Sequence, residues 1–126
     1  MLQVIAICLG ASIGALARWG LGLWLNTSTA LLPWGTLAAN LIGGYLVGVC
    51  VAVFNNLPQL DPVWRLALVT GFLGALTTFS SFSAEVVGML NLHRYALALG
   101  TAALHLLGSL ALTVLGLKTA MILMGK

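Results

Sequence analysis

Apolar residues are concentrated in four long stretches of the chain, which short polar segments separate. The stretches cover residues 4–25, 34–54, 66–90 and 95–124. Each is long enough to cross a bilayer as a helix, which takes about 20 residues. The segments between them are rich in Asn, Asp and Pro, which favour turns and end helices. The pattern therefore predicts an all-α membrane protein, with one domain over residues 1–126 and four transmembrane helices.

The composition excludes a soluble domain. The chain is 61% hydrophobic and 6% charged, whereas soluble domains usually carry roughly 25% charged residues. The net charge of +3 comes with five scattered basic residues that form no patch, so we expect the lipid bilayer and no nucleic acid as a partner. Cys8 and Cys50 lie within spans without metal-ligand spacing, so we expect both to serve packing.

The basic residues give little indication of orientation. With four spans, both termini lie on one side, where Arg65, Lys118 and Lys126 are expected. Arg94 falls near the other side, and Arg18 lies in the first span toward that side. The positive-inside rule needs a clear excess to fix an orientation. We therefore expect that the chain can insert both ways, and a chain that does so could build an antiparallel dimer.

Small and polar residues recur at every fourth position of the first span. Gly10, Gly14, Arg18 and Gly22 drift slowly along one face of the predicted helix, and the glycines allow close contact with a neighbouring helix. An arginine within a span costs about 2.5–3.5 kcal/mol on insertion scales. Arg18 is therefore expected either to reach the interface or to line an aqueous vestibule.

The second and fourth spans carry rows with the same spacing. In the second span, Asn40 precedes Gly44 and Gly48. The Asn40 amide can donate two hydrogen bonds, which suits an anion, but it could equally clamp two packed helices. The row in the fourth span consists of Thr101, His105, Ser109 and Thr113. Four aligned polar residues form a continuous polar track, which is more than packing usually supplies, although packing remains the alternative. His105 alone is interpreted as a structural hydrogen-bonding residue.

The third stretch contains a dense cluster of hydroxyl groups. Residues 71–83 include two threonines, three serines and two glycines. Hydroxyls and irregular backbone persist at membrane depth only against protein or water. Phe79 and Phe82 are three residues apart and so share one helical face. We interpret this segment as the working part of a membrane pore.

The chain has two carboxylates. Asp61 precedes Pro62 and is expected to be a turn or cap residue. Glu85 lies within the third stretch, where it could pair with Arg18 or line a pore mouth. The sequence does not choose between these two roles for Glu85.

Four segments of the chain resemble the motifs of one family. Residues 71–85 resemble the signature of the Fluc fluoride channels, also called CrcB-like proteins. Residues 14–19, 35–43 and 108–113 resemble the motifs of their first, second and fourth helices. The resemblance covers essentially the whole chain, and the motif of the third helix is highly specific.

The resemblance implies an architecture and an activity. It implies four transmembrane helices per subunit with a broken third helix, assembled as an antiparallel dual-topology homodimer in the bacterial inner membrane. It also implies passive export of cytoplasmic fluoride through two pores, with a structural sodium ion at the dimer interface. The break is expected over residues 74–78, where the chain carries Ala75 although relatives often carry glycine.

The resemblance also implies roles for individual residues. Phe79 and Phe82 would flank fluoride, and Asn40 would be the pore asparagine. The candidates for hydroxyls along the ion path are Ser80, Ser81, Ser109 and Thr113. The backbone carbonyls of Gly74 and Thr77 would hold the sodium ion.

Three other functional classes fit the sequence less well than a channel does. A small dual-topology proton-coupled multidrug exporter needs a carboxylate within the membrane, which such proteins carry in helix 1, whereas the first span here has Arg18 and no acid. A scaffold subunit would explain the glycines but not the aligned hydroxyls. An enzyme is not expected, because two histidines and two carboxylates supply no nucleophile, base and acid set.

Overall fold

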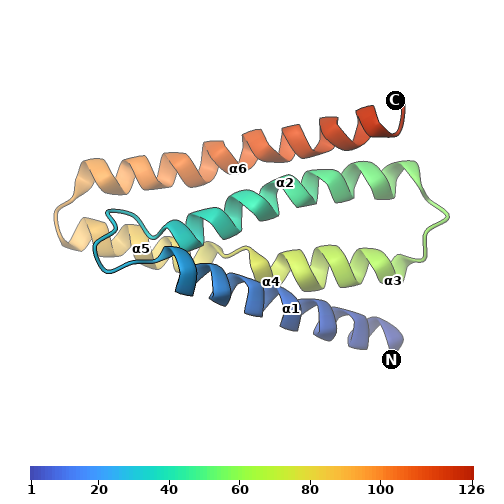
Figure 1. The fold of residues 1–126 in the computed structure, drawn as a ribbon, viewed down its shortest axis with the longest axis horizontal. Coiled ribbons are helices and arrows are strands. Elements are labelled where there is room, and N and C mark those ends of the chain that lie inside the picture. Colours follow the sequence, from blue (N-terminus) through green and yellow to red (C-terminus); the bar gives the residue numbers. More distant parts are fainter.

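The computed structural model describes residues 1–126 as helices that run up and down along one axis (Figure 1). The long helices are α1 (Leu2–Leu25), α2 (Trp34–Asn56) and α6 (Tyr95–Leu123). Between α2 and α6 lie α3 (Pro62–Arg65), η1 (Leu66–Leu73), α4 (Gly74–Leu76) and α5 (Phe79–Asn91), which together form one candidate span of 30 residues. The chain thus has four helical segments that are long and apolar enough to cross a membrane, which confirms the prediction of four such segments. Both termini lie at the same end of the bundle.

The third span is not uniform along its length. η1 is a π-helix of eight residues, a geometry that rarely exceeds one turn and is frequent at functional sites. Thr77 (φ −81°, ψ 153°) and Thr78 (φ −148°, ψ 121°) have extended backbone, and α5 begins directly after them. Gly74 was expected to be non-helical but is the first residue of α4, so the prediction for residues 74–76 is wrong. The span keeps the same general direction on both sides of the threonines (Figure 1).

The bundle consists mainly of two closely packed helix pairs. α2 packs along α6 and α1 packs along η1, with fewer contacts between the pairs. Glycines bring the backbones together: a Cβ at Gly14 would overlap the carbonyl oxygen of Phe72, and a Cβ at Gly48 would overlap that of Thr113. The recurring glycines therefore serve close helix contact, as their spacing indicates.

Replacing Gly48 by alanine is expected to destabilise the fold, because the new methyl group would have to displace the backbone of α6 at Thr113 and Leu117. Overpacking of this kind costs about 1–3 kcal/mol. The midpoint of thermal unfolding in detergent measures the effect. Gly100→Ala is the matched control, because a Cβ at this helical position meets nothing within 4 Å. Equal midpoints for the two variants would contradict the close approach of α2 and α6.

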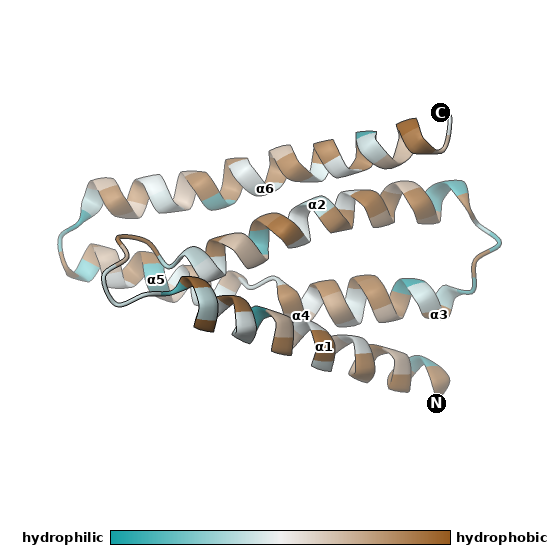
Figure 2. Cartoon of the chain, in the orientation of Figure 1, coloured by the Kyte–Doolittle hydropathy of each residue, from teal (hydrophilic) through white to brown (hydrophobic).

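Few side chains are buried within the single subunit. Only 20 of 126 residues are buried, and the core cluster consists of Ala39, Leu73 and Leu76. Large apolar side chains are exposed along every long helix, and Figure 2 shows apolar residues along the whole length of these helices. Because soluble monomers rarely expose so much contiguous apolar surface, this surface suits a lipid bilayer and packed protein partners.

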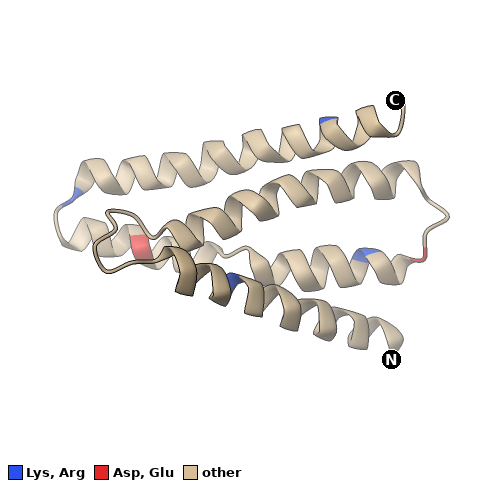
Figure 3. Ribbon diagram, viewed as in Figure 1, with Lys and Arg blue, Asp and Glu red and all other residues tan.

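The charged residues are few and dispersed over the bundle, without a basic patch (Figure 3). Asp61 caps α3: its Oδ1 accepts a hydrogen bond from Val63 N at 2.9 Å, and Pro62 occupies the first turn. The prediction of a turn or cap role for Asp61 is confirmed. This cap begins the third span, which carries most of the candidate site.

Candidate functional site

A groove of about 630 Å³ lies beside the extended residues of the third span, with further walls from α2 and α6. The predicted site residues that line it are Asn40, Gly74, Thr77, Phe79, Phe82, Ser109 and Thr113. His105 of α6 lines the same groove. The fold therefore brings the polar positions of three spans to one place.

Asn40 connects α2 to the extended backbone of the third span. Its Oδ1 accepts a hydrogen bond from Thr78 N at 2.7 Å, and its Nδ2 donates to Thr78 O at 3.0 Å. The side-chain amide thus pairs with both polar backbone groups of one residue. Its Nδ2 also lies 3.0 Å from His105 Nδ1. Both Nδ2 hydrogens have partners within the chain, so this structure contains the interhelical clamp that was one of the two alternatives for Asn40.

Side chains replace two helical hydrogen bonds around the extended residues. In a continuous helix, Thr78 N and Ser81 N would donate to the carbonyls of Gly74 and Thr77. Instead, Thr78 N donates to Asn40 Oδ1, and Ser81 N donates to Thr78 Oγ1 at 3.1 Å. The carbonyls of Gly74 and Thr77 therefore lose their helical partners beside the groove that both residues line.

Phe79 and Phe82 form an aromatic pair on the groove wall. Their ring centroids are 5.5 Å apart with an interplanar angle of 61°, which is an edge-to-face contact. Phe79 is 80% exposed, whereas Phe82 also packs against the ring of His105 at a centroid distance of 4.6 Å. Because the edge of an aromatic ring carries partial positive charge, this pair can present ring edges to an anion.

The polar row of α6 does not offer four free hydrogen-bonding groups. Thr101 is buried and its Oγ1 donates to Met89 Sδ at 3.4 Å. Thr113 Oγ1 donates to the carbonyl oxygens of Ser109 and Gly44, at 2.8 and 2.9 Å. The Ser109 hydroxyl lines the groove and forms no hydrogen bond within the chain, so it is the available donor of this row.

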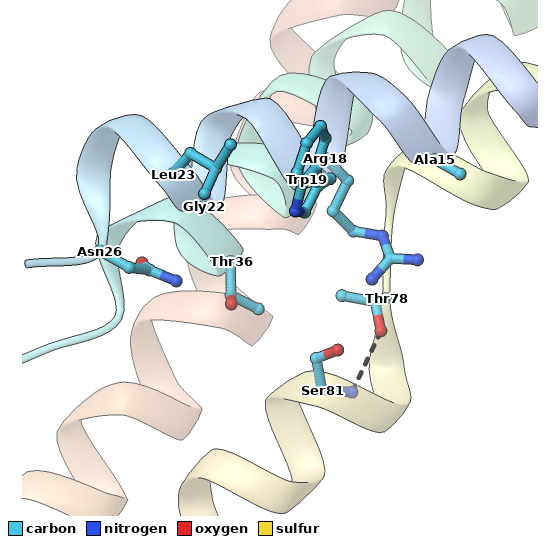
Figure 4. A pocket seen from close by; sticks show the side chains of 9 residues that line it. All are labelled: Ala15, Arg18, Trp19, Gly22, Leu23, Asn26, Thr36, Thr78 and Ser81. Atoms are coloured by element: carbon cyan, nitrogen blue, oxygen red, sulfur yellow. Dashed lines mark hydrogen bonds between the residues drawn. The ribbon is translucent and has the colours of Figure 1, made fainter.

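A second cavity, of about 290 Å³, lies between α1 and the start of α5 (Figure 4). Arg18 extends from α1 toward Thr78 and Ser81, which also line the cavity, and its Nε donates to Ala75 O at 3.0 Å. An arginine within a span requires such carbonyls or water. Arg18 was expected either to reach the membrane interface or to line a vestibule, and its position in the cavity wall agrees with the second role.

Glu85 and Ser80 lie outside both cavities. Glu85 does not pair with Arg18; its Oε1 accepts a hydrogen bond from Thr36 Oγ1 at 2.5 Å, and its Oε2 is buried without a partner. Because Thr36 lines the cavity at Arg18, Glu85 is linked to that cavity through one side chain. Ser80 is exposed, with its hydroxyl 3.2 Å from that of Thr78.

Sequence reasoning missed Thr36 and Thr78 as site residues. Thr78 could have been found, because a threonine directly before a helix is a common N-cap, and its side chain indeed accepts from Ser81 N. The contact of Thr36 with Glu85 joins residues 49 positions apart, and no local pattern indicates it.

The chain is similar to known proteins over nearly its whole length. Residues 5–117 match the model of a family described as CrcB-like protein, Camphor Resistance (CrcB). A protein of Albidiferax ferrireducens named fluoride-specific ion channel FluC is 76% identical over 120 residues, which cover 95% of this chain and 92% of that protein. A protein of the same name from Variovorax paradoxus is 67% identical over 94% of each chain. One from Paracidovorax citrulli is 60% identical over 96% of this chain and 95% of its own.

Proposed function

The chain belongs to the CrcB-like family, and we propose that it is a fluoride-selective passive channel that releases fluoride from the cytoplasm. The observation that carries the proposal is the 76% identity, over 95% of the chain, to a protein named as a fluoride-specific ion channel. The chain is a multi-pass protein of the bacterial inner membrane, and it is an ion channel and not an enzyme. A proton-coupled exporter is not favoured, because α1 has no carboxylate.

The chemistry of the groove supports a path for a small anion. Fluoride is tightly hydrated, so a selective pore has to replace its water with short hydrogen bonds and oriented dipoles. The Ser109 hydroxyl and the edges of Phe79 and Phe82 are suitable groups on the groove wall. No lysine or arginine lines the groove. This favours conduction, because an ion must be bound weakly enough to leave.

The second cavity is suited to be the vestibule of this path. The Arg18 guanidinium raises the local concentration of anions, and Ser81 supplies a hydroxyl on the same cavity. Thr36 lies at its wall and donates a hydrogen bond to Glu85, which lies outside the cavity. Ser80, which is exposed at the start of α5, would meet the ion between this cavity and the groove.

The groove is suited to be one wall of a pore that a second subunit completes. Phe79 is 80% exposed in the single subunit, whereas a narrow pore has to enclose its ion. An antiparallel dimer would repeat the same contact twice and so form two pores. The weak bias of basic residues permits both orientations in the membrane.

The backbone at Gly74 and at the extended residue Thr77 is suited to hold a structural sodium ion at the dimer interface. Unpaired carbonyls at membrane depth cost several kcal/mol each, and the carbonyls of Gly74 and Thr77 have lost their helical partners. Backbone carbonyls can replace the hydration shell of a monovalent cation. The chain has no cluster of three His, Cys, Asp or Glu side chains for a metal, so oxygen atoms of the backbone and of hydroxyls would be the ligands.

Prolonged removal of sodium is expected to reduce fluoride flux and to weaken the dimer, because the carbonyls that face the ion would be left unpaired. Exchange into potassium buffer, followed by flux measurement and light-scattering mass determination, tests this. Restoring sodium is the control and should restore both properties. A dimer that keeps full flux after exhaustive exchange would rule out the sodium site.

Anion efflux from liposomes that contain the purified protein tests the proposed function. Fluoride- and chloride-sensitive electrodes record both ions from the same vesicles. We expect rapid fluoride release without chloride release and without a proton gradient. A folded dimer that releases no fluoride would refute the proposal, and equal release of both ions would refute its selectivity.

A further inference from the structure

The orientation of the Asn40 amide is fixed by the backbone of Thr78. Thr78 N can only donate, so the atom that faces it at 2.7 Å must be the oxygen of the amide. Thr78 O can only accept, so the atom that faces it at 3.0 Å must be the nitrogen. A flipped amide would oppose donor to donor and acceptor to acceptor, and is excluded.

This orientation determines the protonation of His105. The amide nitrogen that faces His105 Nδ1 at 3.0 Å carries a hydrogen, so Nδ1 has to accept it and cannot carry a proton. The imidazole must therefore be neutral, with its single proton on Nε2. An imidazolium, or the other neutral tautomer, would place two N–H groups against each other.

The surroundings of His105 connect it to two residues of the groove. The residue is only 5% exposed, and its ring packs against Phe82 at 4.6 Å while its Nδ1 holds Asn40. Its Nε2 is buried without a partner in the subunit. A side chain that served only to fill space would not need a fixed tautomer beside a polar clamp.

We propose that His105 is a positioning residue of the pore, which holds the Asn40 amide, and through it the extended backbone at Thr78, as a neutral imidazole protonated at Nε2. The same ring packs against Phe82, whose other aromatic neighbour is Phe79. The role concerns the shape of the pore wall and requires no contact between His105 and the ion. Its effect on flux rests on the proposed function as a fluoride channel.

Replacing His105 by asparagine or by glutamine distinguishes the role of its Nδ1 from that of its Nε2. Asparagine at position 105 carries its oxygen near the place of Nδ1, whereas glutamine carries its amide near the place of Nε2. We expect His105→Asn to keep most of the fluoride flux, and His105→Gln and His105→Leu to lose about tenfold or more, because the amide clamp then lacks its acceptor. Equal flux for the Asn and Gln variants, in dimers of the same size as wild type, would overturn the proposal.

Nitrogen NMR of the intact channel in lipid provides a test that needs no flux. His93 has φ 58°, which asparagine tolerates, so His93→Asn leaves His105 as the one histidine. At neutral pH we expect an unprotonated Nδ1 close to the Asn40 amide nitrogen, and a protonated Nε2. A protonated Nδ1 would overturn the proposal even if the variants fail to fold. A wild-type channel without fluoride flux would refute the proposed function, while the NMR result would still decide the position of the proton.

Discussion

Fluoride release is expected to fall about two- to tenfold when Phe82 is replaced by isoleucine. The ring of Phe82 contacts Phe79 edge to face and lies beside His105 on the groove wall. Isoleucine keeps an apolar side chain there but has no polarised edge for an anion. An oriented aromatic contact is worth about 0.5–1.5 kcal/mol, and about 1.4 kcal/mol corresponds to a tenfold change in rate. Phe79→Ile should act in the same way.

The flux of these variants is measured in liposomes with a fluoride electrode, at protein densities matched by dimer content. Phe54→Ile is the matched control, because Phe54 lies on α2 away from both cavities. The control should keep the flux of the wild type. If the Phe79 and Phe82 variants also kept it, the ring edges would have no role in conduction.

Replacing Asn40 by leucine is expected to remove both stability and flux. Leucine has a similar size but leaves Thr78 N, Thr78 O and His105 Nδ1 without their partners. Each buried polar group that loses its partner costs about 1–3 kcal/mol. The sum should lower the unfolding midpoint in detergent well below that of the wild type, and the extended residues should no longer be held against α2.

Asn55→Leu is the control for this substitution, because Asn55 is exposed near the end of α2. Asn40→Asp separates the contribution of the amide oxygen of Asn40 from that of its amide nitrogen. An aspartate can still accept from Thr78 N, but its second oxygen would face Thr78 O, which can only accept, and His105 would have to carry a proton on Nδ1 to pair with it. We expect it to be nearly as harmful as leucine. An unchanged midpoint in both Asn40 variants would show that the clamp does not stabilise the fold.

The four spans could be predicted because their length and apolar character are local properties of the sequence. The same holds for the glycines of α1 and α2, whose spacing alone indicates close helix contact. Partners across the bundle could not be predicted in this way. Arg18 and Glu85 each had several possible partners, and the fold joins them to Ala75 O and to Thr36.

The third span shows most clearly which features could not be predicted from the sequence. Its glycines and threonines indicated irregular backbone, but the extended residues are confined to Thr77 and Thr78. Their position depends on the amide of Asn40, which lies 38 residues away and replaces a helical bond. The adjacent serines were grouped together in the prediction, yet Ser81 lines the cavity at Arg18 and Ser80 does not. Successive helical residues point about 100° apart, so one position decides which cavity a side chain reaches.

The π-helix η1 has a consequence for the tolerance of this chain to changes in length. Each of its turns contains more residues than a turn of α-helix, because its hydrogen bonds span five residues instead of four. A chain shortened by one residue within Leu66–Val69 could therefore wind as ordinary α-helix and still deliver Thr77 and Thr78 to Asn40 in nearly the same register. A deletion of the same size in α5 could not be absorbed in this way, because α5 contains no π-helical turn with an extra residue. It would turn every later side chain of that helix away from its present neighbours. The eight residues of η1 are thus the part of the third span where a natural or engineered deletion is most easily absorbed.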